Sequence, residues 1–319
     1  RRPPRTTLFP YTTLFRSRTR SLPIQQTEMN TPDSTSAPAL ASRPVPWIHL
    51  AWFGALLAAC YAPVLMRLGN DWIIDEDMGH GFFVPAVALY VAWLKKDEIL
   101  GNTYKPFLPG LAIVLLGGLQ LMAATLGVEL FLSRTAFIVS LCGILLTMGG
   151  WKLLKDLAFP LFLLVFMVPL PAIIYNQITF PLQLLASQIA EHTLSAVGIP
   201  VLRDGNILEL PSQRLSVVEA CSGIRSLLSL TFLSLVYGYF FDNKTWMRWV
   251  LLVLTIPIAL TANAFRVTIT GILSEVNPEL AQGLFHSLEG WVIFMIALAM
   301  LVAAHKIANS VYARVAKRG

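Results

Sequence analysis

The sequence is poor in charged residues. Asp, Glu, Lys and Arg make up only 13% of its 319 residues, whereas 55% are hydrophobic and the mean hydropathy is +0.64. A soluble domain carries roughly 25% charged residues. The shortage excludes an ordinary soluble protein, and apolar runs long enough to cross a bilayer predict an all-α polytopic membrane protein.

Cysteine is scarce as well. The three cysteines form no pairing pattern, CxxC motif or Cys/His cluster, which argues against a disulfide scaffold and a zinc, haem or iron–sulfur centre. The sequence also lacks a P-loop and a Gly-rich dinucleotide-binding motif in the right context. We therefore expect no metal and no cofactor. Cys60 and Cys142 lie inside apolar runs and are predicted to be inert, whereas Cys221 lies at the end of one.

The basic balance of the chain says little about partners. The formal net charge is +6, but residues 1–28 contain six Arg and one Glu and so supply +5 of it. This stretch also nearly repeats itself, at 6–9 and 12–15. We interpret it as a non-native leader, with Met29 as the start. The remainder gives no reason to expect a nucleic-acid partner.

Eight apolar segments are predicted to cross the membrane as helices within one domain, residues 47–305. They are 47–68, 81–94, 107–126, 130–150, 158–175, 222–241, 249–265 and 285–304. Residues 29–46, rich in Ser, Thr and Pro, are predicted to be a disordered cytoplasmic tail. Residues 306–319 are predicted to be a basic cytoplasmic tail, and the lipid bilayer is the first partner implied.

Segment 176–220 differs from the rest. Gln177–Val197 mixes polar and apolar residues at near-helical spacing, which predicts an interfacial or partly inserted amphipathic helix. Gly198-Ile199-Pro200 ends it. Short strands are expected at 201–203, 206–210 and 215–219, with a hairpin turn at Asp204-Gly205. Open strand edges cannot face lipid, so this part must lie outside the bilayer or against protein.

The basic loops predict the orientation of the chain. If the eight segments alternate, the lysines and arginines around 95–105, 152–155 and 244–248 and those of the C-terminal tail all fall on one side. The positive-inside rule makes that side cytoplasmic. We therefore expect both termini in the cytoplasm and segment 176–220 on the outer side.

This topology brings three reactive residue types to the outer face. Cys221 and His286 would each begin a span there, and Arg266 would end one. The N-terminal end of a helix favours a thiolate, and Arg225 would follow on the same helical face. A cysteine nucleophile needs a base and an oxyanion donor, which His and Arg supply. Ser222 is a rival nucleophile.

Each residue also has a plainer interpretation. Cys221 can be a small buried hydrophobe, Arg266 a snorkelling residue at a span end, and His286 a helix cap. His80, next to Gly81 at the same face, is a rival base or a substrate contact. The coincidence of side and depth favours the catalytic interpretation.

The chain resembles the exosortase/archaeosortase family in several ordered motifs. The three signature blocks are Glu219–Arg225, which contains the Cys221-Ser222 pair, Asn263–Arg266 and Phe285-His286. The blocks 169–171, 198–201 and 203–206 and the His80-Gly81 pair also fit, although Gly79 stands where the family usually has Ser. The resemblance covers residues 50 to 305.

The resemblance implies a bacterial inner-membrane cysteine transpeptidase whose active site faces the periplasm. Its partners would be membrane-anchored proteins with a C-terminal sorting signal of the PEP-CTERM kind, often in bacteria that make exopolysaccharide. Cys221 would be the nucleophile, Arg266 the oxyanion stabiliser and His286 the acid/base. Substrate-binding or supporting roles would fall to Glu219, Ser222, Arg225, Asn263 and His80.

Two other classes of function stay open from the residues alone. A transporter-like protein without enzymatic activity would place ionisable residues near mid-span and carry internal repeats, and we find no convincing repeat. A membrane acyltransferase acting on lipid or polysaccharide would use Cys221 or Ser222 to form an acyl-enzyme. Composition does not separate the acyltransferase from the transpeptidase.

Overall fold

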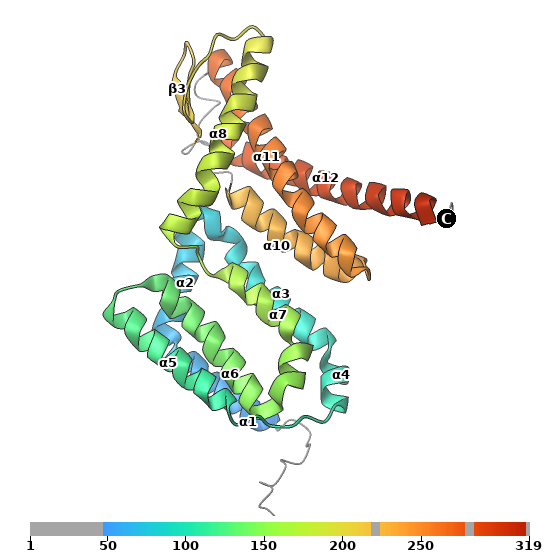
Figure 1. The fold of residues 1–319 in the computed structure, drawn as a ribbon. Helices are drawn as coiled ribbons and strands as arrows, with labels where there is room; N and C mark the ends of the chain where they lie inside the picture. The colour runs from blue at the N-terminus through green and yellow to red at the C-terminus, as the bar shows by residue number, and fades with distance from the viewer. Residues whose placement is uncertain (1–46, 218–223, 278–283, 317–319) are drawn as a thin grey trace, which may run out of the picture. The chain divides into compact units, whose positions relative to one another are not determined.

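The computed structural model describes residues 47–217, 224–277 and 284–316 (Figure 1). They form a mostly helical chain with a small sheet between α8 and α10. The helices are α1 (Trp47–Cys60), α2 (Ala62–Ile74), η1 (Glu76–Phe82), α3 (Phe83–Leu94), α4 (Lys96–Gly101), α5 (Gly110–Leu126), α6 (Leu130–Asp156), α7 (Ala158–Leu163), η2 (Leu164–Met167), α8 (Ala172–Ala196), α10 (Ile224–Phe241), α11 (Thr245–Val276) and α12 (Leu284–Ala316).

The predicted count of eight spans is not confirmed. By length and composition, four stretches of the described chain can cross a membrane, namely 77–94, 130–156, 245–276 and 290–315. The count rises to six if two sharply bent helix pairs are each one span. Two further apolar helices, 110–126 and 225–241, fall below the length required. Each overlaps a predicted apolar segment, but the second bent pair also includes most of the predicted amphipathic stretch 177–197.

The bends coincide with prolines. The pair α1 and α2 turns by 72° at Tyr61, just before Pro63 in the first turn of α2. The pair 158–167 and 172–196 turns by 83° across the stretch that contains Pro169 and Pro171. Proline lacks the N–H that a continuing helix needs. The spans predicted at 47–68 and 158–175 thus fall on bent helix pairs, and α8 carries the predicted amphipathic stretch as the second arm of one of them.

Three helices run further than predicted. The polar stretch after Arg266, expected to be a connection, continues α11 to Val276, so Arg266 lies inside a helix and not at its end. The expected basic loop at 151–155 is helical within α6, which kinks at Gly150, where φ is 66°. A non-glycine residue rarely adopts that φ. Helix α12 extends to Ala316.

The predicted strands are confirmed. β1 (Leu202–Asp204), β2 (Ile207–Glu209) and β3 (Arg214–Ser216) form an antiparallel sheet in the order β1-β2-β3. Leu208 pairs with Arg203 on one side and with Leu215 on the other. The sheet packs on the C-terminal parts of α8 and α11. The buried residues between them, which we call the hairpin core, are Ala190, Leu194, Leu208, Leu210, Leu215, Val217 and Val267.

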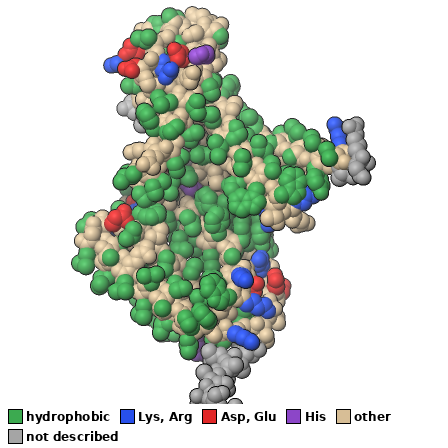
Figure 2. All heavy atoms as spheres, in the orientation of Figure 1, with side chains coloured by type: hydrophobic (Ala, Val, Ile, Leu, Met, Phe, Trp, Pro, Cys, Tyr) green, Lys and Arg blue, Asp and Glu red, His purple; other side chains and the backbone are tan. Residues whose placement is uncertain are grey.

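Further cores lie between the apolar helices. One joins α10, α11 and α12 through buried Leu230, Leu251 and Leu301. Another joins α2, α3, η2 and α10. Figure 2 shows hydrophobic side chains over most of the helical surface, with charged side chains gathered near the hairpin and around α4. An apolar belt between charged ends is what a bilayer requires.

Candidate active site

The signature block that contains Cys221 lies between two described elements. β3 ends at Ser216 and α10 begins at Ile224. Cys221, Glu219 and Ser222 themselves lie outside the described residues, and so does the predicted placement of the thiol. Arg225, in the first turn of α10, is described, and its surroundings define this side of the site.

Arg225 forms an ion pair with Asp77 of η1. The Arg225 Nε donates to Asp77 Oδ1 at 3.3 Å, and the hydroxyl of Tyr175, at the start of α8, donates to Asp77 Oδ2 at 2.6 Å. The Asp77 carboxylate thus joins η1, α8 and α10. The exposed fraction of its side chain is 19%, against 41% for Arg225.

His80 lies one turn further along η1 and is buried. Its ring packs against Phe232 of α10, with 6.4 Å between ring centroids. The neighbouring Gly81 is needed for space: a Cβ added there would lie 2.3 Å from Cδ1 of Trp72. The indole is held in place because Trp72 Nε1 donates to the Met167 carbonyl at 3.0 Å. The His80-Gly81 pair therefore fixes η1 against α2 and α10.

Arg266 contacts α12 close to His286. A Cβ added at Gly290 would lie 3.4 Å from Nη2 of Arg266, so the guanidinium lies against the α12 backbone. Gly290 follows His286 by four residues, about one helical turn. The His286 backbone lies in α12, and its side chain lies outside the described residues. Asn263, one turn before Arg266, is buried in α11.

The part of α11 before Arg266 is about as long as a bilayer core is thick. From residue 245 to residue 266 the helix rises about 32 Å at about 1.5 Å per residue, and a bilayer core is about 30 Å thick. Beyond Arg266, α11 enters the hairpin core through Val267. Arg266 thus lies between the apolar half of α11 and the half that packs on the sheet.

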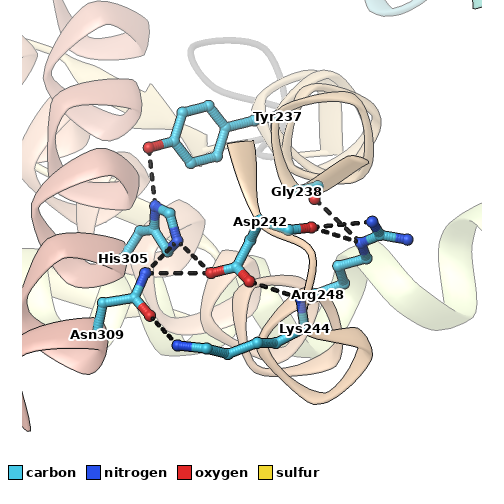
Figure 3. Close-up of polar contacts among 7 residues, drawn as sticks. All are labelled: Tyr237, Gly238, Asp242, Lys244, Arg248, His305 and Asn309. Carbon is cyan, nitrogen blue, oxygen red and sulfur yellow. Dashed lines mark hydrogen bonds and ion pairs between the residues drawn. The ribbon is translucent and has the colours of Figure 1, made fainter. Parts of the chain in front are cut away.

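A second polar cluster lies at the other ends of α10, α11 and α12 (Figure 3). His305 Nε2 lies 2.9 Å from Asp242 Oδ2, and His305 Nδ1 lies 2.9 Å from the Tyr237 hydroxyl. Asn309 Nδ2 donates to the same Asp242 oxygen at 3.1 Å, and the Lys244 backbone N–H donates to Oδ1 at 2.7 Å. His305, which the sequence pattern does not connect to function, is therefore a buried structural residue.

This cluster perturbs the carboxyl of Asp242. Burial alone raises the pKa of Asp242, but the hydrogen bonds from His305, the Lys244 N–H and Asn309 outweigh burial and lower the pKa to about 2. Arg248 closes the same turn by donating to the backbone carbonyls of Asp242 and Gly238. The cluster ties three helices together and leaves the carboxylate ionised.

No group of three or more His, Cys, Asp or Glu within residues 47–217, 224–277 and 284–316 is placed to hold a metal ion. The absence of a cofactor stays a prediction.

Two residues near the site are not found by sequence reasoning. Asp77 is one of several acidic residues in the loop before α3, and Tyr175 follows a Pro-rich bend. Their only signal is position: Asp77 precedes His80 by three residues, and Tyr175 opens the segment that leads to the hairpin.

The fold defines a class of protein: a helical membrane protein with a small antiparallel sheet that packs on α8 and α11. A family model described as transmembrane exosortase matches residues 72–303, and the chain belongs to that family. The predicted resemblance to the exosortase family is thereby confirmed. Searches of the curated proteins and of the solved structures find no match.

Proposed function

We propose that this exosortase-family protein is a cysteine peptidase and transpeptidase that cleaves C-terminal sorting signals of exported proteins. The substrates would carry a short Pro-Glu-Pro-type motif, a transmembrane helix and a basic tail. The site would face the periplasm of a bacterial inner membrane, with both termini of the enzyme in the cytoplasm. Surface attachment of the cleaved protein, in cells that make exopolysaccharide, would follow.

In this mechanism the Cys221 thiolate attacks the carbonyl carbon of the scissile peptide bond. Arg266 stabilises the oxyanion of the tetrahedral intermediate. The C–N bond then breaks, His286 gives its proton to the leaving amine, and the acyl group stays on Cys221 as a thioester. An acceptor nucleophile, deprotonated by His286, attacks the thioester and releases the thiolate.

One observation carries the proposal beyond the family match: the guanidinium of Arg266 lies against Gly290, one turn from His286. Two of the three proposed catalytic residues thus come from adjacent turns of different helices. Arg225, four residues after Cys221 in the sequence, lies in the first turn of α10, which packs on both α11 and α12.

We further propose that segment 176–220 holds the substrate strand. A groove of about 570 Å³ is lined by Tyr175, Thr179, Gln183 and Asn206 among others. Its polar lining is amide and hydroxyl groups without a charged side chain, which suits an extended peptide backbone. Strand addition at the sheet edge is a second way to hold the same peptide.

The test is to express Cys221→Ala and Cys221→Ser beside a tagged protein that carries a Pro-Glu-Pro-type sorting signal. We expect the wild type to shorten the substrate on a gel and both variants to leave it at full length. Processing by both variants would overturn the cysteine mechanism. Exposed Gln177→Trp, which narrows the groove, should slow processing, and an unchanged rate would argue against the groove as the substrate site.

A further inference from the structure

We infer that Asp77 is a positioning residue for the active site, which holds the first turn of α10 against α8. This inference rests on the proposed function, because it concerns the helix that follows Cys221. Asp77 does not belong to the signature blocks, and its role depends on contacts between segments far apart in the sequence.

The two oxygens of the carboxylate have different partners. Oδ1 accepts from Arg225 Nε at 3.3 Å, and Oδ2 accepts from the Tyr175 hydroxyl at 2.6 Å. Their partners come from two different helices, α10 and α8. Both bonds are charge-assisted because the acceptor is a carboxylate, and the bond from Tyr175 is the shorter of the two. One side chain therefore joins the helix after Cys221 to the helix that lines the groove.

Asp77 is itself held firmly. Its backbone N–H donates to the Asp75 side chain at 2.9 Å, which caps η1. The next residue, Met78, is 3% exposed, and His80 is 9% exposed and packs on Phe232. Because η1 is anchored on both sides of Asp77, the backbone that carries the carboxylate is held in place beside Arg225 and Tyr175.

The arrangement explains why an arginine stands at position 225. A long cationic side chain in a first helical turn is mobile unless something holds it, and ordering it costs up to about 2 kcal/mol of side-chain entropy. Asp77 fixes Arg225, and with it the start of α10, at a constant distance from the groove. The substrate peptide and the nucleophile then meet in a defined geometry. A small misplacement of either one would slow the reaction by orders of magnitude.

The experiment measures kcat and KM of the full-length protein in liposomes, with a tagged sorting-signal substrate. Asp77→Asn keeps the shape and removes the charge, Arg225→Gln removes the other charge, and Asp77→Glu keeps the charge on a longer stem. We expect Asp77→Asn to lower kcat about 10- to 100-fold with KM nearly unchanged. Asp77→Glu should recover part of the loss, and the double variant Asp77→Asn/Arg225→Gln should be no slower than the worse single variant.

A matched control comes from an exposed contact outside segment 176–220, in which Lys152 Nζ of α6 donates to Asn102 Oδ1 at 2.9 Å. Lys152→Gln, Asn102→Ala and their combination should each stay within about twofold of the wild type, since exposed contacts contribute little. If Asp77→Asn does not accumulate in the membrane, Tyr175→Phe tests the inference in its place, because it removes only one hydroxyl. We expect the kcat of Tyr175→Phe to fall at least threefold.

The inference is overturned by a wild-type kcat in Asp77→Asn or Tyr175→Phe, by a rise in KM alone, or by losses that multiply in the double variant. Cys221→Ala is measured in parallel. If Cys221→Ala is inactive while Asp77→Asn is fully active, only the positioning role fails. If Cys221→Ala still cleaves the substrate, the proposed function fails and the role of Asp77 fails with it.

Discussion

Arg266 is the described residue whose surroundings bear most directly on the proposed cleavage reaction. It lies inside α11, against the α12 backbone at Gly290, with Asn263 buried one turn before it. Guanidinium is planar and offers several donors in fixed directions, whereas an ammonium is a point charge on a flexible stem. The close contact with Gly290 therefore suits arginine specifically.

We expect Arg266→Lys to lower the processing rate about 100- to 1000-fold, the usual cost of losing an oxyanion donor. Lysine keeps the charge, so a loss of this size would indicate donor geometry and not charge alone. The measurement is the initial rate of substrate shortening, with the amount of enzyme in the membrane checked by immunoblot. A rate within threefold of wild type would argue against an oxyanion role.

Gly81 offers a second prediction at the same scale. An alanine Cβ at this position would lie 2.3 Å from the Trp72 ring. Gly81→Ala should therefore displace the indole and destabilise the protein by about 1–3 kcal/mol, seen as a lower melting temperature in detergent. Gly79→Ala is the matched control, because nothing lies within 4 Å of a Cβ there. Equal melting temperatures for the two variants would contradict the packing argument.

Among the elements, α10, α11 and α12 are tied together by the Asp242 cluster. Asp242 is 6% exposed and His305 is 8% exposed as side chains. Removing one partner of such a cluster leaves a buried polar group without its hydrogen bond, which typically costs about 1–3 kcal/mol. The cluster thus holds together three helices that carry Arg225, Arg266 and His286 further along their lengths.

The lowered pKa of Asp242 predicts an acid limit to stability. The folded state holds the pKa at about 2, against 3.8 for a free carboxyl, so the folded state binds the proton less readily. The stabilisation is therefore complete above about pH 4 and is lost as the pH falls towards 2. The melting temperature of Asp242→Asn should be lower at neutral pH and vary less with pH in that window. A parallel decline in both proteins would contradict this assignment.

The local elements could be predicted from the sequence, whereas the longer-range contacts could not. The strands follow a short β-rich stretch with a turn, and the bends follow prolines. The sequence predicts a polar connection after Arg266 because Glu275 and Asn277 follow there, whereas α11 continues to Val276. Thr268 and Ser274 lie in this extension. Their hydroxyls donate to the helix's own carbonyls, at Ala264 and Gly271, so they can be buried in a helix.

The candidate site shows the same division. Arg266, His286 and Arg225 are predicted from spacing, side and family motifs, and their roles stay predictions. The partners of Asp77 lie 98 and 148 residues away in the sequence, at Tyr175 and Arg225. The hydrophobic pattern of a single segment does not predict such a pairing, because the pairing depends on how η1, α8 and α10 pack together.

At the scale of the whole molecule, the core between α10, α11 and α12 is separate from the hairpin core, and α11 contributes residues to both. Leu208 is fully buried in the hairpin core, and Leu202 of β1 is 66% exposed. Leu208→Ala should cost about 2–5 kcal/mol through the cavity that it leaves, and should make 198–217 sensitive to protease in intact membranes. Leu202→Ala should not. If both variants resist the protease equally, the sheet is held by something other than this core.

Helix α11 runs without a break through both interiors. The part before Arg266 and the part after it are therefore fixed relative to each other, both in rotation about the helix axis and in distance along it. One residue inserted between Arg266 and Val267 would turn the sheet-facing half by about 100° and lift it by about 1.5 Å, pointing Val267 away from Leu208. Seven inserted residues would nearly restore the direction but raise the sheet by about 10 Å. The helix therefore sets the distance and the direction from Arg266 to the surface on which the sheet packs. A hairpin grafted from another family member will fit only if the number of α11 residues between Arg266 and that surface is kept.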